Sequence, residues 1–378
     1  MPDSISKPTG GLGVQLKHII KHSNGIDWDI VAQPDDNPNL ENYKSVYNPL
    51  PNIQHASLIT AICQIEYFAQ AIKRPKPDLV HAYDWSTFFA GYYTAKYFNV
   101  PLVVTMQLSI NLLNQAGITY ASDINSSDGY WINKAHCEME MFGLHNADKV
   151  IHVSNGYAKR FIGIDEKSYL VPNGIDADDW QKFNKKKLPG KGKIKLIYIG
   201  RMALMKNVQA LINSKVPKNI DLIFVGNDKG GERQVFDGML KFVEENDNVH
   251  YYGESFGQDK IDLLNNADAI IVPSVHEPFG IVALEGLASK SIVLSSWVDG
   301  LGDFLNEDNS IYCGTSVEDI ENSYSKLLSL SNKQKNNIIN SGLNTLKNYS
   351  WESASFKTKK VYQDALDSFN SSSVNPLP

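Results

Sequence analysis

The segment Ile194-Lys-Leu-Ile-Tyr-Ile-Gly200 decides the fold class, because it is a short apolar, partly β-branched run that ends at a glycine. Four similar runs follow it at residues 220–226, 248–253, 269–274 and 291–296. Runs of this kind, separated by amphipathic stretches, are typical of buried parallel strands that alternate with helices. We therefore predict an α/β domain with a doubly wound sheet over residues 181–349.

The first half of the chain repeats this pattern. Residues 78–82, 100–105 and 149–154 are predicted strands, and residues 86–99 a helix. A second Rossmann-like domain is thus expected over residues 1–180. Only seven residues precede the loop Pro8-Thr-Gly-Gly-Leu-Gly13, and none favours a strand strongly. The first strand of this domain is expected to be missing or very short.

The segments between and after these domains differ in composition. Residues 182–193 are basic, contain Gly and Pro and have no apolar period, which favours a solvated interdomain linker. Residues 350–368 are predicted to be helical and residues 369–378, rich in Ser, to be disordered. Doubly wound sheets bind ligands beyond the C-termini of their strands, so two such domains predict a site in a cleft between them.

Composition excludes several classes of protein. The 378 residues carry a net charge of −6, which argues against a dedicated nucleic-acid binder. No apolar run is long enough for a transmembrane segment and no secretory signal is visible, so we expect a cytoplasmic protein. Three distant cysteines do not support a disulfide framework. His18 and His22 lie four residues apart on a predicted helix but lack the flanking Glu and the third ligand of zinc proteases, so we expect them to be surface residues.

Two clusters of residues could bind phosphate. Gly10-Gly-Leu-Gly13 precedes a helical stretch, and a phosphate contact there is about as plausible as a structural turn. Arg201 follows the strand that ends at Gly200, and Lys206 lies five residues further on. A guanidinium and an ammonium group together could hold a diphosphate and stabilise it as it leaves. Two ordinary surface cations are the alternative.

The segment Glu277-Pro-Phe-Gly-Ile-Val-Ala-Leu-Glu285 combines two carboxylates with a predicted helix start. Pro278 suits the entry to a helix, and the amides of residues 280–282 would be the unpaired donors of its first turn. The two carboxylates could bind the sugar and the ribose on either side of a diphosphate. A capping carboxylate and a solvated glutamate are the alternative.

A polar cluster, His81-Ala-Tyr-Asp-Trp-Ser-Thr87, lies at the end of a predicted strand in the first domain. Polar groups beside an aromatic ring suit a carbohydrate subsite, although Asp84 or Ser86 could equally cap the next helix and Trp85 could belong to the core. No Gly-x-Ser-x-Gly segment is present, so a hydrolase triad has no anchor.

Together these motifs resemble the retaining, nucleotide-sugar-dependent glycosyltransferases of the GT-B architecture, above all family 4 and the glycogen and starch synthases. Similar segments run along nearly the whole chain. They are Gly10–Gly13, Asp78–Thr87, Ala147–Ser154, Val171–Asp176, Gly200–Lys206, Glu277–Glu285 and Ser350–Ser355. The resemblance implies two Rossmann-like domains that face a central cleft, with the C-terminal helix crossing back to the first domain.

The resemblance also implies roles for single residues. Glu277, Arg201 and Lys206 would be catalytic, and the donor would contact Gly11, Gly280, Ile281, Val282 and Glu285. His81, Asp84, Trp85 and Gln107 would contact the acceptor or the transferred sugar. The two cations would take up leaving-group charge, so neither a metal nor a cofactor is expected.

Some positions depart from the family pattern. Gln107 stands where the family usually has His, and Tyr83 replaces the second His of a His-x-His-Asp-Trp segment. Lys290 stands at a position that is usually Gly, and Val298-Asp-Gly-Leu replaces Gly-Gly-Leu. These changes weaken an assignment as a glycogen synthase.

The function expected from the sequence is transfer of a hexose from a nucleoside diphosphate sugar to a glucan-type acceptor. Glucose is the favoured hexose. A lipid or small-molecule acceptor is a second hypothesis. A sugar-nucleotide or glycan-binding protein without catalysis is the third.

Overall fold

The computed structural model describes residues 11–31, 43–47, 56–118, 127–161, 165–228 and 231–374. The chain forms two compact units, one made of residues 1–174 and 351–378 and the other of residues 175–350. The division therefore falls six residues before the expected boundary at 180/181. Each unit is described separately below.

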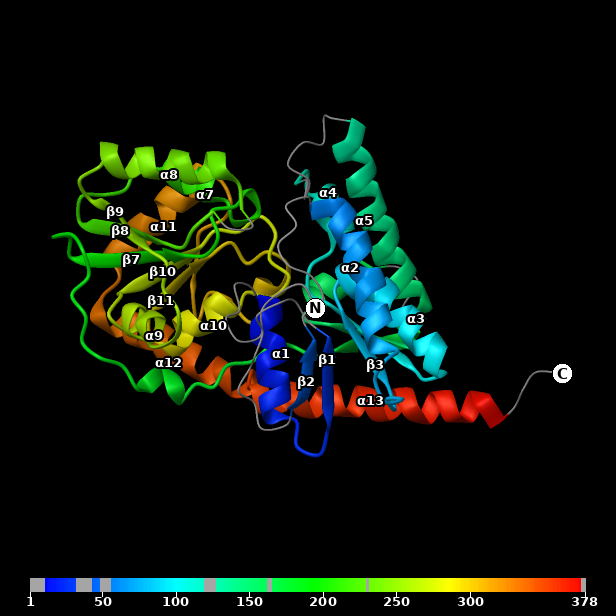
Figure 1. Ribbon diagram of the computed structural model, residues 1–378. Coiled ribbons are helices and arrows are strands. Elements are labelled where there is room, and N and C mark those ends of the chain that lie inside the picture. The colour runs from blue at the N-terminus through cyan, green and yellow to red at the C-terminus, as the bar shows by residue number, and fades with distance from the viewer. Residues whose placement is uncertain are drawn as a thin grey trace. The chain divides into compact units, whose positions relative to one another are not determined.

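The second unit is built on a six-stranded sheet in which every strand pair is parallel. The strand order is β12-β11-β10-β7-β8-β9, which is the doubly wound order expected from the repeated apolar runs (Figure 1). Its strands are β7 (Ile194–Ile199), β8 (Ile220–Val225), β9 (Val249–Gly253), β10 (Ala269–Val272), β11 (Ile292–Ser295) and β12 (Ile311–Tyr312). Its α-helices are α7 (Val208–Ile212), α8 (Arg233–Glu245), α9 (Gly257–Asn265), α10 (Ile281–Ala288), α11 (Val317–Ser329) and α12 (Asn332–Thr345). Short 3₁₀ turns are η3 (Asp179–Gln181), η4 (Leu204–Lys206), η5 (Asp299–Asp303) and η6 (Leu346–Asn348).

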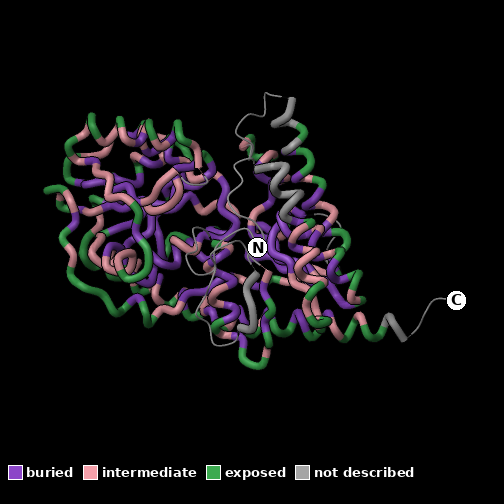
Figure 2. The backbone as a smooth tube through the Cα atoms, viewed as in Figure 1, coloured by how far each residue is buried: buried purple, intermediate pink, exposed green. Residues whose placement is uncertain are grey.

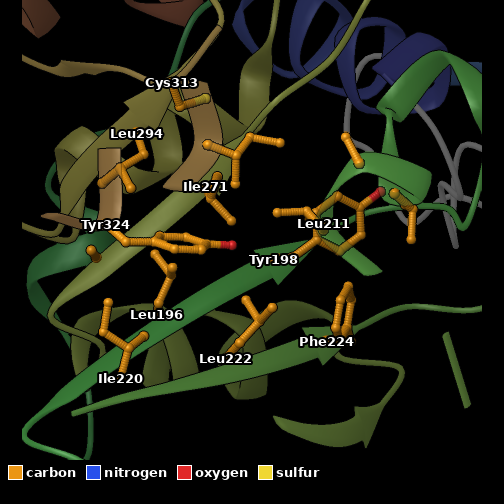
Figure 3. Packing of buried hydrophobic residues seen from close by; sticks show 14 of the residues in the cluster. Leu196, Tyr198, Leu211, Ile220, Leu222, Phe224, Ile271, Leu294, Cys313 and Tyr324 are labelled. Carbon is orange, nitrogen blue, oxygen red and sulfur yellow. The ribbon is translucent and has the colours of Figure 1, made fainter. Parts of the chain in front are cut away.

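Alternate residues of the central strands form the core of this unit. Leu196 and Tyr198 of β7 pack with Leu222 and Phe224 of β8 on one face of the sheet (Figure 3). Tyr324 of α11 lies over the same face, and its hydroxyl is 3.1 Å from Ser214 Oγ. Strands β8, β10 and β11 are buried along their whole length, and β7 along most of it (Figure 2). A rigid platform of this kind fixes the loops that follow the strands.

The basic segment 182–193 is not an interdomain linker, because it lies inside the second unit. Its main chain and side chains form hydrogen bonds and an ion pair with α9. Asn184 N donates to Asp262 Oδ1 over 2.9 Å, Gln258 Nε2 donates to the carbonyl of Lys182 over 2.8 Å, and Lys186 pairs with Asp259. Composition gave no indication of these partners, since a lysine-rich loop is equally compatible with free solvation.

The first unit contains a four-stranded parallel sheet of order β3-β4-β5-β6 and a separate parallel pair, β1-β2. The strands are β1 (Trp28–Val31), β2 (Tyr43–Tyr47), β3 (Val80–Tyr83), β4 (Leu102–Met106), β5 (Lys149–His152) and β6 (Ser168–Leu170). The α-helices are α1 (Gly11–His22), α2 (Ala56–Ala71), α3 (Phe88–Phe98), α4 (Ile110–Gln115), α5 (Ser127–Asn146), α6 (Asn155–Ala158) and α13 (Trp351–Val374), with 3₁₀ turns η1 (Trp85–Thr87) and η2 (Asp165–Lys167). The predicted strands are confirmed. The residues ahead of Gly11, where a missing first strand was predicted, lie outside the described residues.

The C-terminal helix α13 belongs to the first unit, as predicted. The ring of Trp351 stacks on His18 with 4.8 Å between centroids, and Ser355 Oγ donates to the carbonyl of Ile19. The helix continues to Val374, six residues beyond the predicted end at 368. Residues 369–374 were expected to be disordered because they are rich in Ser and Asn, yet they extend the helix.

Candidate active site

The loops after β7 and β10 form the candidate site of the second unit. These neighbouring strands flank the point at which the strand order reverses, where doubly wound sheets bind ligands. The carbonyl of Met205 accepts hydrogen bonds from Val275 N at 3.0 Å and His276 N at 3.4 Å. Asn207 Nδ2 donates to the carbonyl of Pro273 over 3.0 Å. The two loops are therefore held against one another by hydrogen bonds to main-chain carbonyls.

Lys206 and Glu277 meet within this loop pair. Lys206 Nζ lies 2.5 Å from Glu277 Oε2, and Ser274 Oγ donates to the same oxygen over 3.1 Å. Glu277 is only 8% exposed, so its polar partners are mainly protein groups and not water. The structure thus brings together two of the three residues that were predicted to be catalytic.

Arg201, the third predicted catalytic residue, follows β7 directly and is half-buried. Its carbonyl accepts a hydrogen bond of 2.7 Å from the hydroxyl of Tyr198. Burial raises the pKa of the Tyr198 phenol, and the nearby charges of Arg201 and Glu277 act on it in opposite directions. The phenol therefore stays protonated and remains a donor to the loop. Arg201 and Glu277 both lie close enough to the buried phenol of Tyr198 to affect its pKa.

Asp299 was not among the predicted site residues, but it supports Glu277. Its Oδ2 accepts a hydrogen bond of 3.0 Å from Glu277 N and lies 2.8 Å from Nδ1 of buried His276. Asp299 adopts a left-handed conformation with φ 44°. Glycine adopts such a backbone angle without steric cost, whereas a residue with a Cβ is strained there. In the sequence, the departure at Val298-Asp-Gly-Leu was the feature that could have indicated a role for Asp299.

The start of α10 is shaped by Gly280. This residue caps the helix with φ 97°, and a Cβ there would lie 2.4 Å from Leu301 Cδ2. The amides of Ile281 and Val282 belong to the first turn of the helix, whose N–H groups have no intrahelical acceptor. A helix start of this kind attracts anions, and the contact of residues 280–282 with the donor stays a prediction.

Glu285 lies one turn into α10 and is buried. Its Oε2 lies 2.5 Å from Nζ of Lys260 on α9. Lys260 was missed by sequence reasoning, because no spacing rule connects a residue of α9 with one of α10. The ion pair fixes the position of the carboxylate that was predicted to bind the ribose.

In the first unit, His81 is held by protein groups at both ring nitrogens. Nδ1 lies 2.6 Å from the hydroxyl of Tyr362 on α13, and Nε2 lies 2.7 Å from Thr105 Oγ1. Burial lowers the pKa of the imidazole to about 3. A neutral ring with two protein partners stabilises the contact between α13 and the sheet. Its predicted contact with a sugar is not tested by this geometry.

Asp84 also has internal partners, because Gln107 N and Leu108 N donate to its Oδ1 over 2.6 and 3.1 Å. Burial raises the pKa of this carboxyl to about 7, against the opposing effect of the two N–H groups. Trp85 is buried against His136, with 4.2 Å between ring centroids. The structure therefore gathers Asp84, Trp85 and Gln107 beyond the ends of β3 and β4.

Two buried polar atoms in this cluster are unsatisfied. Within the described part of the chain, Gln107 Nε2 and Ser86 Oγ have no hydrogen-bond partner. Buried polar groups usually have hydrogen-bond partners, so these two atoms could form hydrogen bonds with a ligand. Ser86 was not a predicted site residue.

Gly11, predicted to contact the donor, is the exposed first residue of α1.

Two family models match the chain, one over each half. The model described as Glycosyltransferase Family 4 matches residues 9–179, and the model described as Glycosyl transferases group 1 matches residues 179–344. An uncharacterised glycosyltransferase of Methanocaldococcus jannaschii is 25% identical over 386 aligned residues, which cover 95% of each chain. Glycogen synthase of Mycobacterium tuberculosis is 25% identical over 253 residues, 63% of this chain and 56% of that protein.

Solved structures show the same fold. Sucrose-phosphate synthase from Thermosynechococcus elongatus aligns with a TM-score of 0.79 at 19% identity, over 97% of this chain and 98% of that one. HepE from Anabaena, solved with UDP-glucose, aligns with a TM-score of 0.68 at 15% identity, over 98% of both chains. Together with the two parallel sheets, these structural matches show the GT-B fold, and the two family models identify the chain as a glycosyltransferase. The two family models place glycosyltransferase sequence over consecutive halves of the chain, Family 4 in the first and group 1 in the second.

None of the helices in the described ranges combines the length and the apolar character that crossing a membrane requires.

Proposed function

We propose that the chain transfers a hexose from a nucleoside diphosphate sugar to a hydroxyl of a glucan-type acceptor. Glucose is the favoured hexose, and the anomeric configuration is retained. The observation that carries this proposal is the ion pair of Lys206 and Glu277 at the reversal of the strand order, beside the helix start at Gly280. Cation, carboxylate and helix N-terminus are the groups that a sugar diphosphate needs.

Each group has a part in the proposed reaction. Arg201 and Lys206 bind the diphosphate and take up the negative charge that develops as the sugar leaves. Glu277 accepts hydrogen bonds from hydroxyls of the donor sugar, and Glu285 accepts them from the ribose. The leaving phosphate assists attack by the acceptor on the same face of the sugar. No protein nucleophile is then required, and we propose that no metal ion or cofactor is required either.

The proposed acceptor contacts come from the first unit. Gln107 Nε2 and Ser86 Oγ are buried donors whose partners a carbohydrate hydroxyl could supply. The resemblance to glycogen synthase supports a glucan as the first acceptor to test, and the complex of HepE with UDP-glucose supports UDP-glucose as one donor.

Nucleotide release tests the proposal. The protein is incubated with ADP-, UDP- and GDP-glucose, with and without EDTA, against glucan, lipid and small-molecule acceptors. We expect release that depends on an acceptor, resists EDTA and gives an α-linked product by NMR. Release only with a lipid or small-molecule hydroxyl would assign the second acceptor class. An absence of turnover with every donor and acceptor would contradict a transferase function.

A binding protein without catalysis is the second candidate, favoured by Gln107, whose amide cannot titrate. Calorimetry with each nucleotide sugar, alongside turnover by the natural chain and by Gln107→His, distinguishes the two. Donor binding without turnover in either protein would support the binding function.

A further inference from the structure

The segment that follows β4, residues 107–111, is held by side chains from other elements of the first unit. The main-chain N–H groups of all five residues donate to side-chain oxygens. Gln107 N and Leu108 N donate to Asp84 Oδ1, Ser109 N donates to the hydroxyl of Tyr157 on α6, and Ile110 N and Asn111 N donate to Glu140 Oε2 on α5. The conformation of this segment therefore depends on three side chains that are distant from it in the sequence.

Glu140 has both of its carboxylate oxygens occupied by this segment. Its Oε1 accepts hydrogen bonds from Ser109 Oγ over 2.5 Å and from Asn111 Nδ2 over 3.0 Å. Its Oε2 accepts from Ile110 N over 2.6 Å. The side chain is 0% exposed, so these donors replace water. Because an ionised carboxylate only accepts hydrogen bonds, a set made of donors alone matches its charged form.

A carboxylate at this buried position is not explained by stability. Burial raises the pKa of the Glu140 carboxyl, and the hydrogen bonds from Ser109, Asn111 and Ile110 oppose that rise. Replacement of a buried charge and its partners by apolar side chains of similar volume is often neutral or stabilising. What the carboxylate supplies is geometry, because one rigid planar group fixes three consecutive residues of the chain.

The same segment carries Gln107, which was predicted to contact the acceptor or the transferred sugar. Gln107 is 8% exposed, and its Nε2 has no hydrogen-bond partner within the ranges that the structure describes. Its main-chain N–H is already bonded to Asp84, so the side-chain amide is the donor that a ligand could use. The position of that amide follows from the main chain, which Asp84 holds at residues 107–108 and Glu140 at residues 110–111.

We propose that Glu140 is a positioning residue for sugar transfer, because it fixes residues 109–111 and thereby the place of the Gln107 amide. The inference rests on the proposed function, in which Gln107 contacts the acceptor or the transferred sugar. Glu140 is not a catalytic residue, since protein donors occupy both of its oxygens. A misplacement of about 1 Å in a reacting complex can cost about 100-fold in rate, so loss of Glu140 should act on turnover.

Hydrogen exchange tests the contact between α5 and this segment without reference to activity. Glu140→Ala removes the acceptor of Ile110 N, whereas Glu140→Gln keeps a carbonyl oxygen that can accept the same hydrogen bond. We expect exchange at Ile110 and Asn111 at least about tenfold faster in Glu140→Ala and within about threefold of the natural rate in Glu140→Gln. Unchanged exchange in Glu140→Ala, in a protein whose β4 amides remain protected, would overturn the proposal.

A double-mutant cycle with Gln107 tests the positioning role. We measure kcat for nucleotide release in Glu140→Ala, Gln107→Ala and the double variant, and donor Kd by calorimetry. Glu140→Ala should lower kcat at least about tenfold and Glu140→Gln at most about threefold, with donor Kd within about twofold of the natural value. The double variant should be no slower than Gln107→Ala within about twofold, since both changes affect one side chain.

The matched control is a second buried carboxylate that holds a loop. Asp221, the second residue of β8, is 1% exposed and accepts a hydrogen bond of 2.6 Å from Gly192 N. It lies where the strand begins, at the edge opposite the loops of the candidate site. Asp221→Ala should therefore lower Tm while kcat stays within about twofold of the natural value.

Two results of the cycle would contradict a positioning role. Effects of Glu140→Ala and Gln107→Ala that multiply in the double variant would show that Glu140 does not act through Gln107. A loss of kcat in Asp221→Ala as large as that in Glu140→Ala would show a general effect of lower stability. Absence of turnover in the natural chain would contradict the proposed function and the positioning role together. Exchange at Ile110 does not depend on turnover, so this failure is distinguishable from failure of the contact itself.

Discussion

Lys206 and Glu277 are 71 residues apart in the sequence, yet Nζ and Oε2 of these side chains lie 2.5 Å apart. Both side chains are largely buried, so each charge is compensated mainly by the other. In the proposed function, Lys206 is shared between Glu277 and the donor diphosphate. The pair therefore connects the sugar subsite with the phosphate subsite.

Removal of either predicted phosphate-binding cation should reduce transfer. Lys206→Ala and Arg201→Ala are each expected to lower kcat/KM by about 100-fold or more, because each removes a charged contact with the leaving group. Steady-state nucleotide release is the measurement. Lys182→Ala is the matched control, since Lys182 forms an exposed pair with Asp179, and its activity should stay within about twofold. If Arg201→Ala also stays within about twofold, its assigned role is wrong.

The buried pair of Glu285 and Lys260 should control donor affinity. Glu285→Gln and Lys260→Ala are each expected to raise KM for the donor about tenfold, with a smaller change in kcat, because the ribose contact is uniform through the reaction. The double variant should cost less than the sum of the two, since both changes disrupt one ion pair. A KM within about twofold of the natural value in Glu285→Gln would contradict the ribose contact.

Gly280 should be far less tolerant of substitution than another glycine with the same backbone angle. Gly280 and Gly253 have φ values of 97° and 96°, but only Gly280 has a neighbour, Leu301, where a Cβ would lie. Gly253→Ala should therefore cost about 1–2 kcal/mol of backbone strain. Gly280→Ala should cost about 1–3 kcal/mol more from overpacking. Urea denaturation measures both, and equal losses would show that the Leu301 contact is unimportant.

Asp84 should make stability depend on pH in an unusual direction. Its pKa is raised to about 7 by burial, whereas an unfolded Asp has a pKa of about 3.9. Between these values the folded state binds more protons, so the contribution of Asp84 to stability falls as pH rises from 4 to 7. Relative to Asp84→Asn, the free energy of unfolding of the natural chain should fall by up to about 1.4 kcal/mol per pH unit between pH 4 and 7. Chemical denaturation at several pH values checks this, and a constant difference between the two proteins would refute it.

Lys290 stands at a left-handed position, with φ 59° and an exposed side chain. Lys290→Gly should stabilise the protein by up to about 1 kcal/mol, because relief of the backbone strain exceeds the added flexibility of the unfolded chain. Lys326→Gly, an exposed position within α11, is the control and should destabilise by about 1 kcal/mol. Thermal or urea unfolding measures both. A loss of stability in Lys290→Gly would mean that the lysine side chain has a role of its own.

Sequence patterns predicted most of the strands because parallel strands buried on both faces must be continuously apolar. The same reasoning placed Lys206 and Glu277 in one site, since the loops after the central strands of a doubly wound sheet converge. It failed for residues 182–193, whose contacts with α9 are made by polar side chains that any solvated loop could carry. It also missed Lys260 and Asp299, which act through partners distant in sequence.

The sequence by itself therefore determined the fold class, because the fold class depends on local apolar periods and short motifs, and the same motifs led to the site residues that stay predictions. The tertiary structure alone decided which charges pair and which polar atoms stay unsatisfied. Those properties depend on distances between residues far apart in the chain, and such distances exist only once the sheet and its helices have packed.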